Sequence, residues 1–286
     1  MKRIILTGAY GQLGHALKSL LAERKDIETL FTDIDSLDIT NREAVLQTVS
    51  DFRPDIIINT AAYTAVDKAE TEPRKATLIN ADAVRNLADA AAATGAYIIH
   101  ISTDYVFNGR KTLPYTEKDS PDPQSAYGRS KLEGEKHLQN ILPKQHIILR
   151  TAWLYGTAGH NFVKTMLSLA AKQDEISVVA DQWGSPTYAP MLAKAIIKII
   201  DTPKWKPGTY HIAGIGRTTW FDFTKAIFDT AGITKCRVRP ITTAQYNAVA
   251  QRPAYSVLDS SLFARTFKFE IPDWQQSLKS YFIDTV

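Results

Sequence analysis

Short apolar runs alternate with stretches of helical spacing through the first half of the chain, and this alternation limits the possible folds more than any other feature. The pattern predicts strands at residues 2–7, 28–33, 55–60, 97–103 and 146–151. It predicts helices at residues 11–24, after Thr40, at 74–94 and from about Ser125. The run at 55–60 is mostly apolar, as a sheet covered on both faces requires. The alternation therefore predicts an α/β fold with a parallel, doubly wound sheet of the Rossmann type.

Two helix ends can be predicted from capping residues. Thr40 with Glu43 three residues later matches a capping box, which predicts a helix beginning after Thr40. Gly95 follows the 74–94 pattern at the position where a glycine commonly ends a helix. The 74–94 segment is therefore expected to be one continuous helix.

The pattern becomes less regular after about residue 150. Strands are predicted at 176–181, 210–214 and 237–241, with helices at 189–200 and 219–231. The length of 286 residues suits one large domain, or a domain with a smaller second lobe. We expect residues 1–150 to form mainly a dinucleotide-binding domain. Residues 151–286 should form mainly a smaller C-terminal substrate-binding lobe, interleaved with the end of the first domain.

Composition argues against several classes of partner. The chain carries 34 Lys+Arg and 30 Asp+Glu, and the excess of +4 is spread along it. Nucleic acids and anionic membranes require clustered cations, so neither is an expected partner. No segment approaches the ~20 apolar residues of a membrane span, and the first apolar run breaks at Gly8, too early for a signal peptide. Cys236, the single cysteine, cannot form an internal disulfide. We expect a soluble, cytoplasmic protein.

Three glycines connect the first strand to the first helix with the spacing G-x-x-G-x-x-G. Gly8 allows a tight turn, Gly11 lets the backbone approach a pyrophosphate, and Gly14 lets the helix pack closely on the sheet. The free N–H groups at the start of the helix favour an anion. The pattern indicates dinucleotide binding, with a ligand-free glycine turn as the alternative.

Asp33 ends the second predicted strand, where an acidic residue usually bonds the adenosine ribose. A carboxylate there repels a 2′-phosphate, which favours NADH, and Asp35 and Asp38 add negative charge. Alternatively, Asp33 only caps a loop. Asp38 and Ile39 could flank the adenine.

Tyr127 and Lys131 are four residues apart and would lie on one face of a helix. A phenol with an ordinary pKa of about 10 is a poor acid at neutral pH, and a neighbouring ammonium is expected to lower that pKa. Reduction of a carbonyl requires such a proton donor. Ser102 and Thr103 end the preceding strand and point to opposite faces, so only one can meet the tyrosine. Thr103 is the preferred choice for orienting the substrate carbonyl, and Ser102 is the alternative.

Together these motifs resemble the extended short-chain dehydrogenase/reductase superfamily. Further motifs are similar to those of the dTDP-4-dehydrorhamnose reductase family: Ala-Val-Asp-Lys-Ala-Glu at 65–70, Asn-Phe-Val-Lys-Thr-Met at 161–166 and Asp-Gln-Trp-Gly-Ser-Pro-Thr at 181–187. The similarity covers nearly the whole chain. It implies reduction of the 4-keto group of dTDP-4-dehydro-L-rhamnose by NADPH or NADH, giving dTDP-L-rhamnose for polysaccharide synthesis.

The resemblance also implies roles for individual residues. Tyr127 would donate the proton, and Lys131 would bond the nicotinamide ribose. The cofactor would further contact Gly11, Gln12, Leu13, Asp33, Asp38, Ile39, Ala62, Tyr63 and Thr64. The sugar would contact Thr103, Asp104 and Trp153, and the nucleotide diphosphate would contact Asn161, Lys164, Gln182 and Arg252. Trp153 could instead be core packing, and Lys164 could be a solvated surface residue.

The chain departs from the family at two positions. Some members dimerise through a magnesium ion held by carboxylates, but His15 and Pro190 stand at two positions that correspond. We therefore expect no metal site and either a monomer or a weak homodimer without a metal-bridged interface. The six histidines lack ligand spacing. Family members often accept NADPH despite the acidic residue, so the choice between NADPH and NADH stays open.

Two alternatives to the reductase are considered. One is an epimerase or 4,6-dehydratase of the same superfamily. The dehydratase needs a second carboxylate where this chain has Tyr105, and the epimerase would retain tightly bound NAD. The other is a non-catalytic subunit resembling the regulatory subunit of methionine adenosyltransferase, because a fold alone does not establish turnover.

Overall fold

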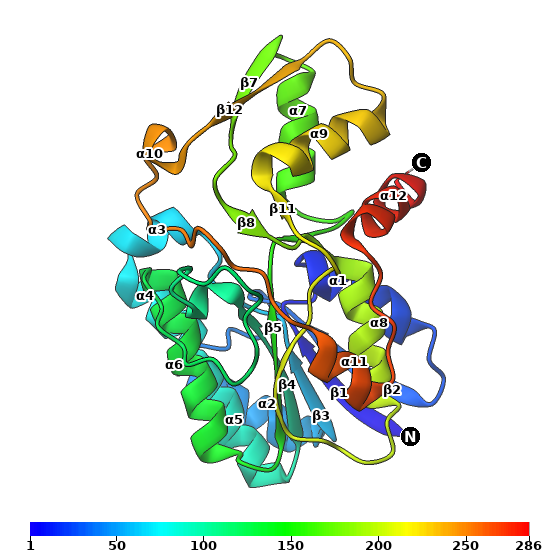
Figure 1. Ribbon diagram of the computed structural model, residues 1–286. Coiled ribbons are helices and arrows are strands. Elements are labelled where there is room, and N and C mark those ends of the chain that lie inside the picture. Colours follow the sequence, from blue (N-terminus) through cyan, green and yellow to red (C-terminus); the bar gives the residue numbers. More distant parts are fainter. Residues whose placement is uncertain (286) are drawn as a thin grey trace.

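A six-stranded parallel sheet forms the centre of the computed structural model, which describes residues 1–285 (Figure 1). Its strand order is β10-β5-β4-β3-β1-β2. The strands are β1 (Lys2–Thr7), β2 (Ile27–Thr32), β3 (Ile56–Asn59), β4 (Tyr97–Thr103), β5 (His146–Thr151) and β10 (Gly208–His211). From β1 the chain adds β2 on one side and then returns to add β3 on the other. The predicted doubly wound α/β fold is confirmed, and the reversal beside β1 creates the crevice where such folds bind ligands.

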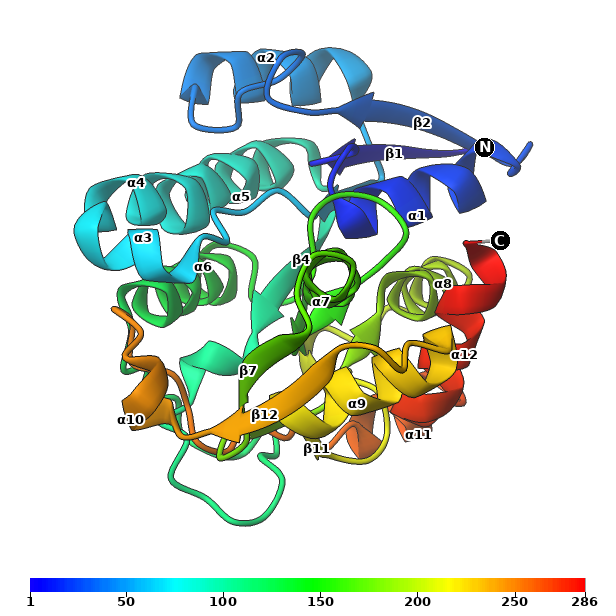
Figure 2. The ribbon, with the colours of Figure 1, turned by 90° about the horizontal axis from the view of Figure 1, so that it is seen from above.

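Helices cover both faces of this sheet (Figure 2). The helices α1 (Gln12–Ala22) and α8 (Ala189–Ile200) pack on one face, and α2 (Arg42–Phe52), α5 (Ala83–Thr94) and α6 (Ala126–Ile141) on the other. Alternate residues of β1 supply both cores: Ile4 and Leu6 join the first, and Ile5 joins the second. The period of two along a strand requires this division, and it explains why the strand is apolar throughout.

The segment predicted as one helix at 74–94 is interrupted. It consists of α4 (Pro73–Thr77), a π-helical turn at Leu78–Asp82 and α5, and it follows the short helix α3 (Val66–Thr71). Asn80 in the π turn accepts a hydrogen bond from the Tyr63 backbone N–H and donates to the Tyr63 carbonyl and the Ser130 hydroxyl. These long-range bonds stabilise the wider turn, which periodicity could not indicate. Gly95 ends α5 with a φ of 77°, as predicted.

The start of α2 also differs from the prediction. Its N-cap is Asn41, whose side chain accepts from the Ala44 N–H, and not Thr40. The Thr40 hydroxyl is engaged instead, because it donates to the Asp38 carboxylate at 2.7 Å. The predicted start of α6 holds, since Ser125 caps that helix through the Gly128 N–H.

The remaining elements gather above the carboxyl ends of the sheet strands (Figure 1). They include α7 (Phe162–Ala170), α9 (Trp220–Ala231), α10 (Thr243–Tyr246) and a two-stranded pair of β7 (Glu175–Val179) with β12 (Arg237–Ile241). Two smaller pairs join β6 (Leu154–Tyr155) to β9 (Thr187–Tyr188) and β8 (Trp183–Gly184) to β11 (Thr218–Thr219). The late elements α8 and β10 return to the sheet, alongside α11 (Ser261–Phe267), and α12 (Trp274–Asp284) packs against α9. No helix within residues 1–285 is long and apolar enough to cross a bilayer.

Candidate active site

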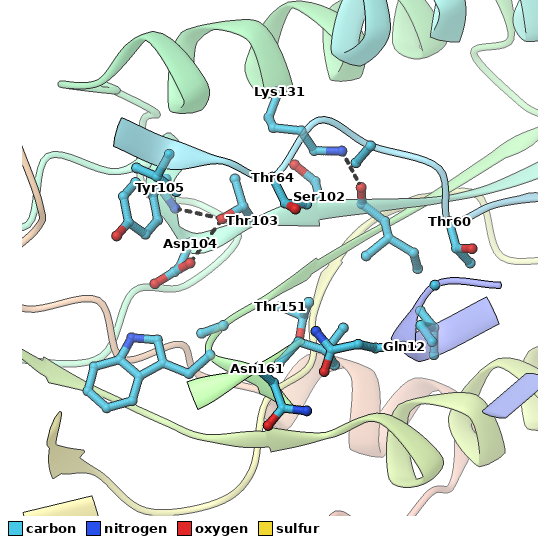
Figure 3. Close-up of a pocket in the computed structure, with 18 of the residues that line it drawn as sticks. Gln12, Thr60, Thr64, Ser102, Thr103, Asp104, Tyr105, Lys131, Thr151 and Asn161 are labelled. Carbon is cyan, nitrogen blue, oxygen red and sulfur yellow. Dashed lines mark hydrogen bonds between the residues drawn. The ribbon is translucent and has the colours of Figure 1, made fainter. Parts of the chain in front are cut away.

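A cavity of about 640 Å³ opens at the carboxyl ends of the central strands, beneath the upper elements (Figure 3). A second cavity, of about 420 Å³, shares Gly11, Thr60 and Ala62 with it. The residues predicted from sequence that line the first cavity are Gly11, Gln12, Leu13, Gly14, Ala62, Thr64, Ser102, Thr103, Asp104, Tyr127, Lys131, Trp153 and Asn161. Gly8, Asp33, Asp38 and Ile39 line the second. The fold thus brings most of the predicted site into one continuous crevice.

The glycine loop has the geometry that a dinucleotide pyrophosphate needs. Gly8 has a φ of 67°, and a side chain there would come within 2.7 Å of the Ala61 backbone nitrogen. A Cβ on Gly14 would lie 2.0 Å from the Gly8 carbonyl oxygen. Gly11 is the N-cap of α1. Within residues 1–285, no side-chain hydrogen bond from this N-cap closes the end of the helix. The first N–H groups of α1 therefore remain available to an anion.

The second cavity has the features of an adenosine site. The Asp33 carboxylate accepts from the Tyr10 N–H at 2.9 Å and from the Ile34 N–H at 2.8 Å, which fixes it beside the glycine loop. Ile39 is buried and offers an apolar wall. The lining also contains the cationic side chain of Lys75, which the sequence did not single out.

Ser102 and Thr103 point to opposite sides of β4, as expected for adjacent residues of a strand. The Ser102 hydroxyl donates to the buried carboxylate of Glu135, away from the tyrosine. The Thr103 hydroxyl donates to Asp104 at 3.0 Å and accepts from the Tyr105 N–H. Thr103 also helps to lower the pKa of the Tyr127 phenol, and both residues line the cavity. Of the two hydroxyls, Thr103 is therefore the one that faces Tyr127.

The expected lowering of the Tyr127 pKa by Lys131 is not found. Burial raises the pKa of Tyr127 well above its usual range, and the negative charge of Asp104 adds to that rise. The Lys131 ammonium donates to the Ile101 carbonyl at 2.6 Å (Figure 3) and is only 2% exposed. Burial lowers the pKa of Lys131 to about 8. The cost of burying charge dominates both pKa values, and Lys131 is not among the groups that shift the pKa of Tyr127.

Asp104 lines the cavity, and one of its carboxylate oxygens lacks a hydrogen-bond partner within residues 1–285. Its Oδ1 accepts from Thr103, whereas Oδ2 is buried and has no hydrogen-bond partner among residues 1–285. Burial raises the pKa of Asp104 to about 6, and the nearby Ser256 and Thr103 hydroxyls reduce that rise, although no hydrogen bond joins Ser256 to Asp104 within residues 1–285. An unpartnered buried oxygen in a cavity wall is suited to accept a hydrogen bond from a ligand hydroxyl.

The residues expected at the nucleotide end are only partly brought together. Asn161 lines the cavity and caps α7. Lys164 donates to the Thr157 carbonyl at 2.6 Å, and Gln182 donates to Thr243. Outside the cavity lining, Arg252 pairs with Asp67 at 2.7 Å and bonds the Tyr105 hydroxyl. The Tyr63 hydroxyl bonds Glu72 and also lies outside the lining.

Trp153 forms part of the cavity wall in a constrained conformation. Its φ is 49°, in the left-handed region, and its ring stacks on Trp220 with centroids 3.4 Å apart. Trp220 and Phe162 also line the cavity, although sequence reasoning did not select them. These three aromatic side chains give the cavity that contains Thr103 and Asp104 a broad aromatic surface.

Polar residues behind the cavity were also missed. Asn59 and His100 are buried beneath the site, and Glu135 and Arg150 form a buried ion pair at 2.6 Å. His100 interrupts an apolar strand, and this exception to the pattern could have identified it. In residues 1–285, no group of three or more His, Cys, Asp or Glu side chains could hold a metal ion.

Comparisons with known proteins agree with this geometry. A family model described as RmlD substrate binding domain matches residues 1–286. The chain is 45% identical to a dTDP-4-dehydrorhamnose reductase of Aggregatibacter actinomycetemcomitans, over 98% of each protein. It is 44% identical to a crystal structure of dTDP-4-dehydrorhamnose reductase from Bacillus anthracis in complex with NADP, with a TM-score of 0.94 and full coverage of both chains. A UDP-glucose 4-epimerase from Thermus thermophilus has a TM-score of 0.84 but 18% identity and shares the fold alone.

Proposed function

Since this chain belongs to the RmlD substrate binding domain family, we propose that it reduces the 4-keto group of dTDP-4-dehydro-L-rhamnose to dTDP-L-rhamnose with NADPH or NADH. The observation that carries the proposal is the Tyr127 phenol beside Thr103, in a cavity that continues from the glycine loop. Two of the similar proteins named above are called dTDP-4-dehydrorhamnose reductases, and the solved structure of one of them is in complex with NADP.

The residues present fit a nicotinamide dinucleotide. The close approaches at Gly8 and Gly14 leave space that any side chain would fill, and Gln12 has a buried Oε1 without a partner in residues 1–285. We assign the pyrophosphate to Gly11, Gln12 and Leu13, and the adenosine ribose to Asp33. The adenine would lie between Asp38 and Ile39, and the nicotinamide half beside Ala62, Tyr63, Thr64 and Lys131. When bound, the reduced cofactor supplies the hydride.

Tyr127 is suited to act as the proton donor. Its raised pKa means that the phenol carries its proton at neutral pH but gives it up less readily than a free phenol. Transfer of that proton to the oxygen of the reduced ketone would therefore depend on stabilisation of the phenolate by Lys131. Thr103 would orient that oxygen next to the phenol. Loss of the proton leaves a buried phenolate, and the Lys131 ammonium would stabilise it from the same face of α6.

The sugar would lie between Asp104 and Trp153. The free Oδ2 of Asp104 can accept from a sugar hydroxyl, and Trp153 offers a flat apolar surface to the ring. Asn161 lines the same cavity and would contact the diphosphate. Lys164, Gln182 and Arg252 now have protein partners, so their proposed contact with the nucleotide requires them to exchange these partners.

We also propose a location and an oligomeric state for the protein. The protein would act in the cytoplasm, and the buried Cys236 thiol needs no oxidising compartment. It would be a monomer or a weak homodimer without a metal-bridged interface, because Pro190 offers no side-chain ligand and His15 replaces a carboxylate. Size-exclusion chromatography with and without a chelator tests this oligomeric state.

The function can be tested with dTDP-4-dehydrorhamnose generated in situ. We expect stoichiometric loss of the absorbance of NADPH or NADH and formation of dTDP-L-rhamnose. Tyr127→Phe should lower kcat by about 10²–10⁴-fold while leaving the cofactor Kd nearly unchanged. Tyr155→Phe is the matched control, since Tyr155 is a buried tyrosine outside the cavity lining. Wild-type turnover by Tyr127→Phe would disprove the proton donor, and sugar interconversion with retained NAD and no net oxidation would indicate an epimerase.

A further inference from the structure

A chain of buried polar side chains runs behind the cavity from β1 to α6. The Thr7 hydroxyl donates to Asn59 Oδ1 at 2.7 Å, and Asn59 Nδ2 lies 3.0 Å from His100 Nδ1. His100 Nε2 lies 3.4 Å from the Lys131 Nζ, which also donates to the Ile101 carbonyl. Thr7, Asn59, His100 and Lys131 are each at most 2% exposed. Sequence reasoning and the proposed mechanism leave Asn59 and His100 without a role.

The direction of the hydrogen bonds in this chain is fixed at Asn59. The Ala61 backbone N–H, which can only donate, contacts Asn59 Oδ1 at 3.2 Å. The amide nitrogen of Asn59 therefore faces His100 and donates to its Nδ1. Burial holds the pKa of His100 well below its usual range, so the ring is neutral. A neutral imidazole that accepts at Nδ1 carries its hydrogen on Nε2.

This tautomer points an N–H group at Lys131. An ammonium at Lys131 would place two donors face to face across 3.4 Å. A neutral amine, in contrast, can accept from His100 Nε2 and still donate to the Ile101 carbonyl. We propose that His100, held by Asn59, is a positioning residue that increases the neutral-amine fraction of Lys131 in the free protein, and that Lys131 takes up the missing proton when the cofactor binds.

The other groups around Lys131 are consistent with this balance. On α6 itself, Glu135 raises the pKa of Lys131, but that carboxylate is paired with Arg150 of β5. Tyr127, one turn earlier on α6, is kept protonated by burial, and Asp104 acts on Tyr127. The one residue of β3 in this row of hydrogen-bonded side chains is Asn59, which is uncharged. A bound diphosphate would add negative charge and favour the ammonium. The inference rests here on the proposed function.

Two measurements test the proposal, and the first needs no cofactor. In ¹⁵N-histidine-labelled free protein, two-bond ¹⁵N–¹H correlations identify the tautomer of His100. We expect hydrogen on Nε2 and none on Nδ1. An Nδ1–H tautomer, or a charged ring at neutral pH, would overturn the proposal whether or not the protein is a reductase.

The second measurement is the number of protons taken up when NADPH binds, from calorimetry in buffers of different ionisation enthalpy. At pH 8 the 2′-phosphate, with a pKa of about 6, is already ionised. With the Lys131 pKa at about 8, about half a proton should be taken up. His100→Leu removes the donor, which should lower the acidity of Lys131 about tenfold and reduce uptake to about 0.1 proton. Tyr127→Phe should keep the wild-type uptake.

Asn59→Asp provides a second variant if His100→Leu does not fold. A carboxylate at position 59 would accept from His100 Nδ1–H, which turns Nε2 into an acceptor facing Lys131. Proton uptake should again fall. The role of His100 would be refuted if the wild type took up no proton. It would also be refuted if Asn59→Asp and His100→Leu took up as many protons as the wild type. A wrong proposed function would give a different result from a wrong role for His100. In that case NADPH would not bind, or the sugar would not be reduced.

Discussion

The buried ion pair between Glu135 and Arg150 allows a quantitative prediction of stability. The two side chains are 0% and 4% exposed, and Arg150 contacts the carboxylate through Nε at 2.9 Å and through a second nitrogen at 2.6 Å. The Ser102 hydroxyl donates to the same carboxylate. Glu135→Met would leave the arginine charge buried without its partner, because an arginine keeps its charge in a protein interior. We expect a loss of about 3–5 kcal/mol in the free energy of unfolding.

Urea unfolding followed by tryptophan fluorescence measures this loss. The matched control is Glu28→Met, which removes the partner of Arg3 from a pair with side chains 36% and 44% exposed and should cost at most about 1 kcal/mol. Adding Arg150→Met to Glu135→Met should restore much of the stability, since an apolar pair can replace a buried ion pair. If Glu135→Met lost no more than the Glu28 control, the unpaired charge would not be the cause we assign.

Three more predictions follow from the cavity walls. In urea unfolding, Asp104→Asn should stabilise the protein by up to about 3 kcal/mol at pH 8 and should not stabilise it at pH 4. The reason is that burial raises the Asp104 pKa from 3.8 to about 6, so the ionised carboxylate is disfavoured in the folded protein. Equal stability of the variant and the wild type at pH 8 would contradict this. Gly14→Ala should abolish NADPH binding in fluorescence titrations, since its Cβ would lie 2.0 Å from the Gly8 carbonyl oxygen. The control is Gly95→Ala, where the added Cβ meets open space. This variant should bind NADPH normally and lose about 1 kcal/mol in the free energy of unfolding. Asp33→Asn should increase the Kd ratio of NADH to NADPH about tenfold in the same assay, because the carboxylate repels the 2′-phosphate; an unchanged ratio would place that phosphate elsewhere.

Local patterns predicted most of the sheet and the wall of the site. The strands β4 and β5 have the predicted bounds, and Ser125 caps α6 as expected. These features depend on hydrophobic period and on neighbouring residues, which a sequence displays directly. The family resemblance is confirmed by the match over residues 1–286.

The features that sequence did not predict depend on distant partners. Arg252 bonds Asp67, 185 residues away, so its position relative to the cavity could not be found from spacing. The π turn depends on contacts between Asn80 and Ser130, 50 residues apart. The acidity of Tyr127 is set by its depth in the folded protein, and a motif of two residues contains no measure of depth.

The π turn at Leu78–Asp82 has a consequence for how this chain can vary in length. Such a turn holds one residue more than a regular helical turn, so α4 and α5 are out of phase with each other. Deleting one residue here would be compatible with a regular helix, but α4 would rotate by about 100° relative to α5. Asn80 could then no longer hold the Tyr63 backbone and Ser130 together. In a comparison of related sequences, a one-residue gap at this point should therefore coincide with loss of the asparagine.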